Sequence, residues 1–178
     1  KDLADAYDRA GDQIRKNATL LSNAEAVEIE KEAKGDVAPI TSDRTGFYNR
    51  KLYLKPGERV ENRGNNQPLN HKLIRLGEVY LNYAEACAKT NAEDEARIYL
   101  KKIRERAGLP EIQSTGDQLF EDIINERRLE LGLEGFRFFD IVRVGWASKT
   151  FKNFKAGAEV LPIPQTEVDI SKGEITNK

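Results

Sequence analysis

Residues able to do chemistry are most concentrated between Asn125 and Arg143, where acidic and basic side chains alternate with aromatic and aliphatic ones. Two carboxylates of this stretch, Glu126 and Glu130, are four residues apart, so on a helix they share one face with Cβ atoms about 5–6 Å apart. A retaining glycosidase needs two carboxyl groups about 5–5.5 Å apart. The spacing therefore permits a catalytic pair.

The neighbours of these carboxylates argue against catalysis. A general acid needs a raised pKa, whereas Arg127 and Arg128 favour the ionised form. The sequence also lacks a Ser/His/Asp or Cys/His arrangement and a phosphate-cradling glycine loop. We therefore predict a non-enzymatic protein in which these charges form a structural ion-pair network, because charges placed among apolar residues must be partly buried and paired. The residues of this motif are Glu126, Arg127, Arg128, Glu130, Glu134, Gly135, Arg137, Asp140 and Arg143.

A second kind of chemistry is indicated by aromatic residues outside the helical patterns. The run Phe47-Tyr48-Asn49-Arg50 combines two rings with an amide and a guanidinium, and Trp146 lies further along the chain. The C–H face of a sugar ring packs against an aromatic plane, while its hydroxyls need polar side chains nearby. These five residues are the candidate ligand-binding residues. The alternative is that the rings fill the domain's own surface.

Metal and cofactor sites find no support in the sequence. Cys87 is the only cysteine and His71 the only histidine, so neither a disulfide within the chain nor a Cys- or His-rich metal site is expected. Cys87 is predicted to be a packed thiol on the apolar side of a helix, and His71 to lie in a loop or at a helix entry. We expect neither metal nor cofactor.

Composition limits the class of partner. The chain has 29 basic and 30 acidic residues and a net charge of -1, so its overall charge attracts neither nucleic acid nor anionic lipid, and a neutral or weakly charged ligand fits better. No apolar stretch reaches the roughly 20 residues of a membrane-spanning helix. Because the sequence begins with Lys1 and has no leader, we expect that a targeting segment was removed or that the sequence begins inside a longer protein.

The elements that must position these residues are clearest in the middle of the chain. Apolar residues recur at three- and four-residue steps from Leu73 to Cys87, which predicts an amphipathic helix. A second helix is expected to be capped by Asn91 and ended by Gly108 and Pro110. The short connection predicts an antiparallel hairpin that resembles one tetratricopeptide unit.

A third helix is expected to begin near Asp117 and to break at Gly135, followed by a short, well-buried fourth helix that ends at Gly145. Further on, Pro162 and Pro164 predict extended backbone within a loop clamped onto the helices.

The N-terminal part is less regular. Residues 1–35 show weak helical periodicity that includes Leu20 and Leu21, and residues 35–70 are rich in turn residues, with a possible strand at 49–54. The predicted organisation is a loop-rich segment at 1–70, a helical core at 71–145 and an irregular C-terminal loop at 146–178.

Four stretches resemble motifs of the SusD-like (RagB/SusD) family. LIRLGEVYLNYAEA, from Leu73, looks like "LIRYADVLLMYAEA", and YLKKIRERAGL, from Tyr99, looks like "YLNKVRARAGL". The stretch from Glu126 to Arg143 looks like "ERRxELxxEGxRxxDLxR", and LPIPQTEV near the end is similar to "LPIPQSEI". Their order and spacing match the C-terminal part of the family. Tyr7-Asp8-Arg9 also resembles the family's earlier "DPR" motif without its proline.

The resemblance implies an all-α fold of tetratricopeptide-like helical hairpins with long irregular loops packed on them. It implies non-catalytic glycan binding at the bacterial cell surface, an N-terminal lipid anchor outside this sequence that holds the protein at the outer membrane, and a SusC-like TonB-dependent transporter as partner. The alternative function is a protein interaction scaffold that covers the transporter and binds peptide or no ligand.

Two departures from the family pattern indicate a fragment. The N-terminal half is absent, and Thr176-Asn177-Lys178 replaces the family's Asn-Pro-Gly-Tyr tail.

Overall fold

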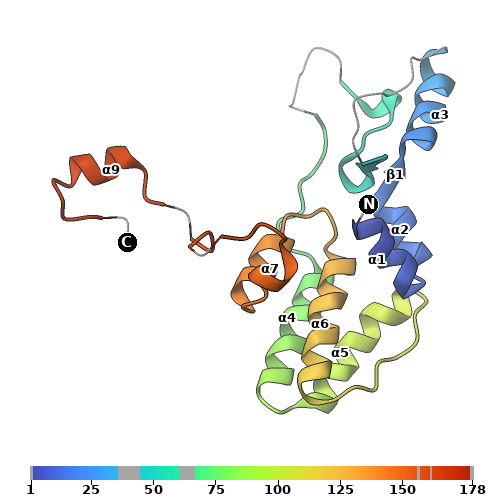
Figure 1. The fold of residues 1–178 in the computed structure, drawn as a ribbon. Helices are drawn as coiled ribbons and strands as arrows, with labels where there is room; N and C mark the ends of the chain where they lie inside the picture. Colours follow the sequence, from blue (N-terminus) through green and yellow to red (C-terminus); the bar gives the residue numbers. More distant parts are fainter. Residues whose placement is uncertain (1, 36–44, 61–66, 156, 161, 177–178) are drawn as a thin grey trace. The chain divides into compact units, whose positions relative to one another are not determined.

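The computed structural model describes residues 2–35, 45–60, 67–155, 157–160 and 162–176. Helices dominate these residues, which confirms the expected all-α class (Figure 1). The chain divides into two compact units, residues 1–136 and 137–178. The family-like position Leu161 and the last two residues lie outside the described part.

The first unit contains six α-helices, one pair of short strands and two turns of 3-10 helix among its described residues. The α-helices are α1 (Asp2–Ala10), α2 (Gln13–Thr19), α3 (Asn23–Lys34), α4 (Leu76–Lys89), α5 (Glu93–Arg106) and α6 (Gly116–Glu130). The remaining elements are β1 (Leu20–Ser22), β2 (Phe47–Asn49), η1 (Arg50–Leu52) and η2 (Pro56–Glu58).

Helices α4, α5 and α6 pack around one apolar core, which confirms the predicted helical hairpin and adds the third helix to it (Figure 1). The fully buried side chains include Leu81 on α4, Leu100 on α5, and Leu119 and Ile123 on α6. Cys87 is buried in the same core as a free thiol, as predicted. The buried face of α4 is formed by Leu81, Ala84 and Cys87, which are three residues apart. The predicted apolar face is wrong at its start, because α4 begins only at Leu76, and Leu73 and Leu76 are both exposed.

The turn between α4 and α5 differs from the prediction. Asn91 does not cap α5, whose N-cap residue is Ala92 and has no side-chain hydrogen bond. Asn91 instead adopts φ 61°, and the Ala92 amide donates to the Cys87 carbonyl at 2.9 Å, which is the Schellman pattern of a helix C-terminus. Asparagine is favoured both as a helix N-cap and in the left-handed conformation that follows a helix, and here it adopts the left-handed conformation. The predicted end of α5 is confirmed by Gly108, at φ 67°.

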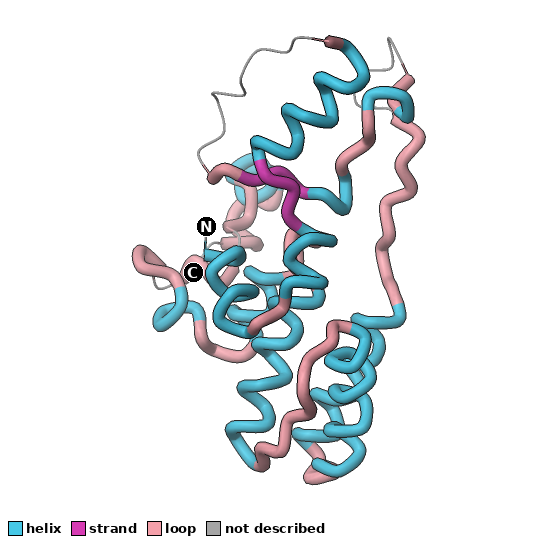
Figure 2. The backbone as a smooth tube through the Cα atoms, turned by 90° about the vertical axis from the view of Figure 1, so that its right-hand side faces the viewer, coloured by secondary structure: helices cyan, strands magenta, loops and turns pink. Residues whose placement is uncertain are grey.

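The N-terminal segment is more ordered than its sequence pattern suggested. Leu20 and Leu21 belong to β1 rather than to a helix, and β1 pairs antiparallel with β2, Leu21 opposite Tyr48. The expected strand at 49–54 is thus shifted to Phe47–Asn49, and a 3-10 turn follows it. Figure 2 shows this strand pair at the base of α3 and the extended segment that leads into α4.

The second unit contains α7 (Arg137–Arg143), α8 (Ala147–Thr150) and α9 (Gln165–Ile170). The expected fourth helix is α7, but it buries only Asp140 and Ile141, while Phe139 is 68% exposed, so the expectation of a well-buried helix was wrong. Extended backbone at 162–164 is confirmed, since Pro164 has φ -52° and ψ 137°. The C-terminal stretch then forms α9, which the sequence analysis did not predict.

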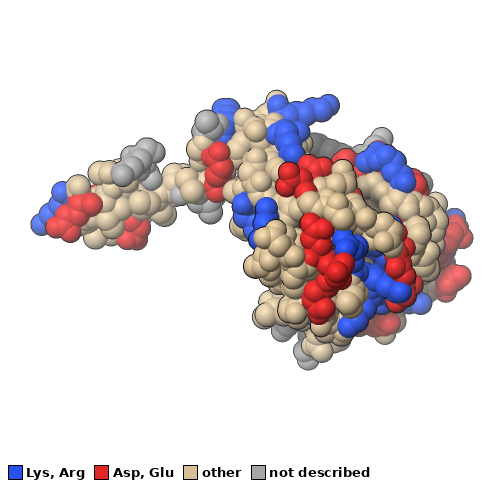
Figure 3. Space-filling model, turned by 90° about the horizontal axis from the view of Figure 1, so that it is seen from below, with Lys and Arg blue, Asp and Glu red and all other residues tan. Residues whose placement is uncertain are grey.

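Acidic and basic side chains lie next to one another over the face of the molecule shown in Figure 3. Some exposed charges form pairs along one helix, such as Arg97 with Asp94 and Lys101 with Glu105 on α5. Among the described residues, no helix is both long and apolar enough to cross a bilayer.

Candidate functional site

A cavity of about 590 Å³ opens beside the C-terminal end of α6. Its wall is formed by α2, the η1 turn, the segment before α4, and the loop that follows α6. Leu52, Leu69 and Leu133 provide apolar surface, and the rest of the lining is mostly charged or polar. A cavity of this size is typical of small-molecule sites.

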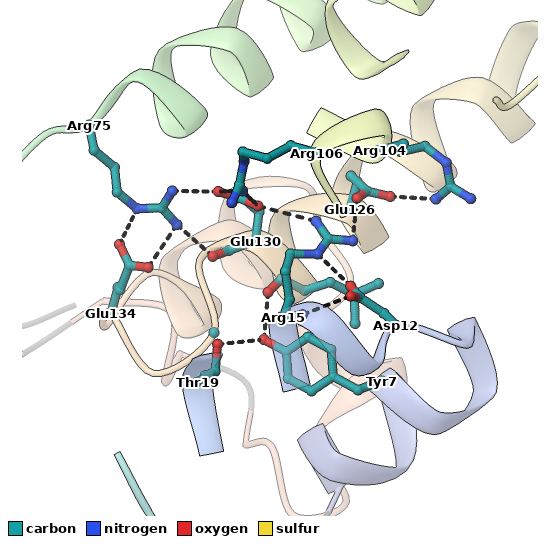
Figure 4. Close-up of polar contacts among 12 residues, drawn as sticks. Tyr7, Asp12, Arg15, Thr19, Arg75, Arg104, Arg106, Glu126, Glu130 and Glu134 are labelled. Carbon is teal, nitrogen blue, oxygen red and sulfur yellow. Dashed lines mark hydrogen bonds and ion pairs between the residues drawn. The ribbon is translucent and has the colours of Figure 1, made fainter. Parts of the chain in front are cut away.

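The floor of the cavity is centred on Glu130, whose side chain is 1% exposed (Figure 4). Its carboxylate accepts hydrogen bonds from Arg75 and from Arg106, the latter at 2.5 Å to Oε2, and Arg15 Nη1 lies 3.2 Å from the same oxygen. Three guanidinium groups from α2, the start of α4 and the end of α5 therefore converge on one carboxylate of α6.

Glu134, in the loop after α6, forms the second part of the floor. Arg75 binds it with two hydrogen bonds, from Nε to Oε2 at 2.8 Å and from Nη2 to Oε1 at 2.7 Å. This two-pronged contact is the strongest geometry for an arginine and a carboxylate. Lys51 donates to Glu134 Oε1 at 2.5 Å and to the carbonyl oxygens of Glu130 and Gly132 at 3.1 and 3.0 Å.

Glu126 lies one helical turn before Glu130 and extends the network into the protein. Arg15 Nη2 lies 2.6 Å from Glu126 Oε1, and Arg104 Nη1 lies 2.6 Å from Glu126 Oε2. Asp12, which is fully buried, accepts hydrogen bonds from the backbone amide and the Nε of Arg15. Asp12, Arg15 and Glu126 thus each have an opposite charge in contact, the condition for charge burial.

Tyr7 links α1 to the C-terminal end of α6, next to the ion-pair network. Its buried hydroxyl donates to the carbonyl oxygen of Leu129 at 2.6 Å and lies 3.2 Å from Thr19 Oγ1 (Figure 4). Burial raises the pKa of Tyr7, so the phenol remains protonated and can donate. The network therefore joins α1 and α2 to α6 through polar contacts rather than through apolar packing alone.

Pairing with arginine sets the ionisation of the carboxylates on the floor. Burial alone would raise the pKa of Glu130, but the hydrogen bond from Arg75 and the charges of Arg75, Arg106 and Arg15 outweigh it, and the pKa lies below its ordinary value. The pKa of Glu134 is lowered in the same way by Arg75 and Lys51, against the effect of burial. Both groups are carboxylates at neutral pH.

This arrangement is unsuited to acid–base catalysis of glycoside hydrolysis. A general acid must hold its proton near neutral pH, whereas the pKa of Glu130 is lowered and its oxygens are occupied by guanidinium groups. No group of three His, Cys, Asp or Glu residues suited to a metal occurs among the described residues. The cavity instead offers a small molecule apolar contacts with its leucine side chains and hydrogen bonds with its polar side chains.

The residues of the predicted ion-pair motif belong to both compact units of the chain. Glu126, Arg127 and Glu130 are buried on α6, as expected, and Arg127 donates to Asn82 of α4 at 2.5 Å. Arg128 is only partly buried and pairs with Asp2. Gly135 adopts φ 91° in the turn that ends the first unit.

The other three members of the predicted network lie on α7, in the second unit. Asp140 is 4% exposed and Arg143 contacts it at 2.8 Å, while Arg137 begins the helix. The motif spans the boundary between two units.

The sequence analysis did not assign Asp12 and Arg15 to the network. They are three residues apart at the start of α2, in a helix with little apolar periodicity, and nothing in their local pattern indicates burial. Arg75, Arg104 and Arg106 did fall inside stretches that resemble family motifs. Their meeting with Glu126 and Glu130 could be inferred only from a fold that brings α4, α5 and α6 together.

The candidate ligand-binding residues occupy two different units. Phe47 packs against the apolar cluster around Tyr7, so its ring serves the protein's own core. Asn49 donates to the carbonyl oxygen of Leu133 at 3.0 Å, and Arg50 pairs with Glu25.

Tyr48 is partly exposed on β2, and its hydroxyl has no hydrogen-bond partner among the described residues. Trp146, at the N-cap of α8 in the second unit, is also partly exposed, and Lys149 Nζ lies 4.1 Å from the centroid of its ring. His71 lies in the segment before α4 and lines the cavity, in agreement with its predicted place at a helix entry.

Comparison with known proteins assigns the fold. The sequence profile described as the SusD family matches residues 13–160. The chain belongs to the SusD family. A SusD-like protein of Bacteroides ovatus is 31% identical over 155 residues, which cover 79% of this chain and 26% of that protein. The chain therefore spans about a quarter of the length of this curated relative.

Two solved structures of SusD-family type superpose on nearly the whole chain. A laminarin binding SusD-like protein is 33% identical, with a TM-score of 0.72, over 94% of this chain and 35% of that one. Surface glycan-binding protein A from Bacteroides thetaiotaomicron, in complex with laminarihexaose, is 28% identical, with a TM-score of 0.78, over 96% and 39%. The tetratricopeptide-like SusD fold expected from the motifs is thus confirmed.

Much of the ion-pair network is built from residues of the stretches that resemble SusD family motifs. Arg75 belongs to the LIRLGEVYLNYAEA stretch, Arg104 and Arg106 to YLKKIRERAGL, and Glu126 and Glu130 to the motif that begins with Glu126. In the structure these three separate stretches meet through their charged residues. The motifs that identify the family are therefore the parts that hold its helices together.

Proposed function

We propose that the intact protein binds oligosaccharides or polysaccharides at the bacterial cell surface without cleaving them and delivers them to a SusC-like TonB-dependent outer-membrane transporter. The observation that carries this proposal is the match, at 28% and 33% identity over at least 94% of the chain, to two structures named for glycan and laminarin binding. An N-terminal lipid anchor on the intact protein would hold it in the outer membrane, facing outward.

Binding without catalysis is supported by the way the two central carboxylates are used. Glu126 and Glu130, the pair with glycosidase-like spacing, each contact two or more arginines and are almost completely buried. A sugar would have to displace buried ion pairs to reach them, and removal of one partner from such a pair costs about 3–5 kcal/mol. These residues stabilise the fold instead.

Five residues are proposed as ligand contacts: Phe47, Tyr48, Asn49, Arg50 and Trp146. Tyr48 is the strongest of them, because it is partly exposed and its hydroxyl makes no hydrogen bond within the described residues, while Phe47, Asn49 and Arg50 are engaged in contacts within the first unit. Trp146 is also partly exposed, with Lys149 over its ring. A partly exposed ring offers the C–H face of a sugar a flat apolar surface at small entropic cost, since the surrounding structure already holds it.

The test is affinity electrophoresis of the intact protein through gels that contain single polysaccharides, with assay of released reducing sugar in parallel. We expect one polysaccharide to retard the protein without being cleaved. Tyr48→Ala or Trp146→Ala should weaken this retardation roughly ten-fold, equivalent to about 1.4 kcal/mol. Tyr48→Phe should retain most of the binding, because it keeps the ring.

Phe120→Ala is the matched control. Phe120 is also a partly buried aromatic residue of the first unit, but it lies on α6 with Lys89 Nζ 3.6 Å from its ring centroid. Its loss should leave binding unchanged. Release of sugar would refute the non-enzymatic function. Unchanged binding in both the Tyr48 and the Trp146 variants would show that other residues form the binding site.

An interaction scaffold is the second candidate, and one observation favours it. Helix α4 and the residues before it expose several apolar side chains close together in the sequence, namely Leu73 (77% exposed), Ile74 (75%), Leu76 (61%) and Val79 (46%). Groups of exposed apolar side chains mark surfaces that bind other polypeptide. Under this alternative, Ile74→Glu would abolish co-purification with the transporter and leave glycan retardation intact.

A further inference from the structure

The cavity beside α6 has a floor whose positive charges are already neutralised. Arg75 uses its Nε and both terminal nitrogens on Glu130 and Glu134, and Lys51 donates to Glu134 and two carbonyl oxygens. Arg15 forms ion pairs with Asp12, Glu126 and Glu130. These cations therefore hold the protein together and have little capacity left for a ligand.

The rim of the cavity differs from its floor. The side chain of Arg106 is 57% exposed, and it binds Glu130 through Nη2 alone, so that Nε and Nη1 have no partner among the described residues. Lys72 and His71 are exposed, line the same cavity, and form no hydrogen bond or ion pair within the described part of the chain. Donors on three side chains thus surround one opening.

The local charge is positive although the chain as a whole has a net charge of -1. The cavity is lined by five cationic side chains and only two carboxylates, Glu130 and Glu134. Asp12 and Glu126 lie behind the floor and pair with Arg15 and Arg104, so four carboxylates face six cations in all, and two positive charges remain in excess. Lys72 and Arg106 are the exposed cations at the rim. A cavity of one sign with low-dielectric walls attracts a ligand of the opposite sign.

The remaining lining defines the shape of ligand that would fit. Leu52, Leu69 and Leu133 form an apolar wall that can face the C–H side of a ring, and the Asn70 amide can exchange hydrogen bonds with hydroxyls. An anionic group on the same ligand would point toward Arg106 and Lys72. A sugar ring that carries a carboxylate combines these three features.

We propose that this cavity binds a uronic acid residue of an acidic glycan, with its carboxylate held by Arg106, Lys72 and His71. The inference rests on the proposed glycan-binding function and specifies its ligand class. Lys72 and His71 lie just outside the family-like stretch that begins at Leu73, whereas Arg75, Arg106, Glu130 and Glu134 lie within such stretches. Lys72 and His71 therefore provide selectivity next to residues of the shared family motifs.

The test is isothermal titration calorimetry of the intact protein with trigalacturonate, with neutral laminarihexaose and with polyglutamate. Wild-type protein should bind trigalacturonate, and binding should weaken as salt rises from 50 to 500 mM, since exposed charges are screened. Lys72→Glu should weaken this binding roughly ten-fold and Lys72→Gln roughly two- to five-fold. The fold should be preserved, because the Lys72 side chain is exposed and forms no hydrogen bond or ion pair within the described residues.

Lys152→Glu is the matched control, since it reverses an equally exposed lysine charge in the second unit and should leave binding unchanged. Binding of laminarihexaose but not of trigalacturonate, or equal trigalacturonate binding by wild type and Lys72→Glu, would overturn the acidic-sugar site and leave the proposed function intact. Binding of polyglutamate alone would show that the rim recognises an acidic peptide and would also overturn it. Failure to bind any glycan here and in the polysaccharide gels would refute the proposed function itself.

Discussion

The two halves of α6 are held by different forces. Its N-terminal half places Leu119 and Ile123 against α4 and α5 in an apolar core, whereas its C-terminal half places Glu126 and Glu130 against arginines from three other segments. Apolar contact is non-directional, so many side-chain arrangements of the right volume satisfy it. The charged half requires every partner to be present in one geometry, because an unpaired buried charge is strongly unfavourable.

This difference predicts opposite responses to substitution. An ion pair in a protein interior contributes little compared with apolar residues of the same volume, because desolvation offsets the attraction. Loss of one member nevertheless leaves the others buried without a counter-charge. The charged half of α6 should therefore be sensitive to single substitutions and should specify which segments assemble, while the apolar half should respond in proportion to the volume removed.

The largest effect is expected for Glu130→Gln. The substitution preserves the size of the side chain but removes the charge that faces Arg15, Arg75 and Arg106, so about 3–5 kcal/mol of the free energy of unfolding should be lost. Urea denaturation followed by far-UV circular dichroism measures this loss. A loss below about 1 kcal/mol would mean that water or rearranged carboxylates replace Glu130 and that the charged half is as tolerant as the apolar one.

The pH dependence of stability gives a second, smaller difference between the charged and the apolar half of α6. The pKa values of Glu130 and Glu134 are lowered in the folded protein, so below about pH 4.5, the ordinary value for glutamate, the unfolded chain binds protons that the folded chain does not. The stability from these groups is present above that pH and is lost as pH falls through the folded pKa values. Urea midpoints measured between pH 6 and 3 should therefore fall steeply, and less steeply in Glu130→Gln.

Leu100→Ala provides the control for this titration. Leu100 is 1% exposed in the apolar core, and its truncation should cost about 2–5 kcal/mol without removing a titrating group. Its stability should be lower at every pH but should fall with the same slope as in the wild type. Equal slopes in all three proteins would show that other carboxylates dominate the acid response.

The same contrast explains what could be predicted from the sequence. The apolar half follows a three-to-four-residue period, so α4, α5 and α6 and the burial of Cys87 were predicted from spacing alone. The charged half has no such period. Glu126 and Glu130 were recognised as structural because they lie among apolar residues, but their partner Arg15 is more than 100 residues away and has no local signal of burial.

Local ambiguity accounts for the other errors. Asn91 is suited to a helix N-cap and to a left-handed turn, and only the hydrogen bond from Ala92 to Cys87 decides between them. Leu20 and Leu21 fit a helix or a strand, and pairing with the segment around Tyr48 decides for the strand. For Asn91 the local turn geometry settled the choice, whereas for Leu20 and Leu21 pairing with a segment more than 25 residues away settled it.

The smallest effect is expected for Asp94→Asn on α5. Asp94 pairs with Arg97, yet its side chain is 97% exposed, and Arg97 retains contacts with Glu93 at 3.6 Å and with the Ser114 carbonyl at 3.0 Å. Water solvates both charges in the folded and unfolded chains, so the pair adds little. The urea midpoint should be unchanged within error. A loss as large as that of Glu130→Gln would show that pairing as such, rather than pairing under burial, determines the stability of these helices.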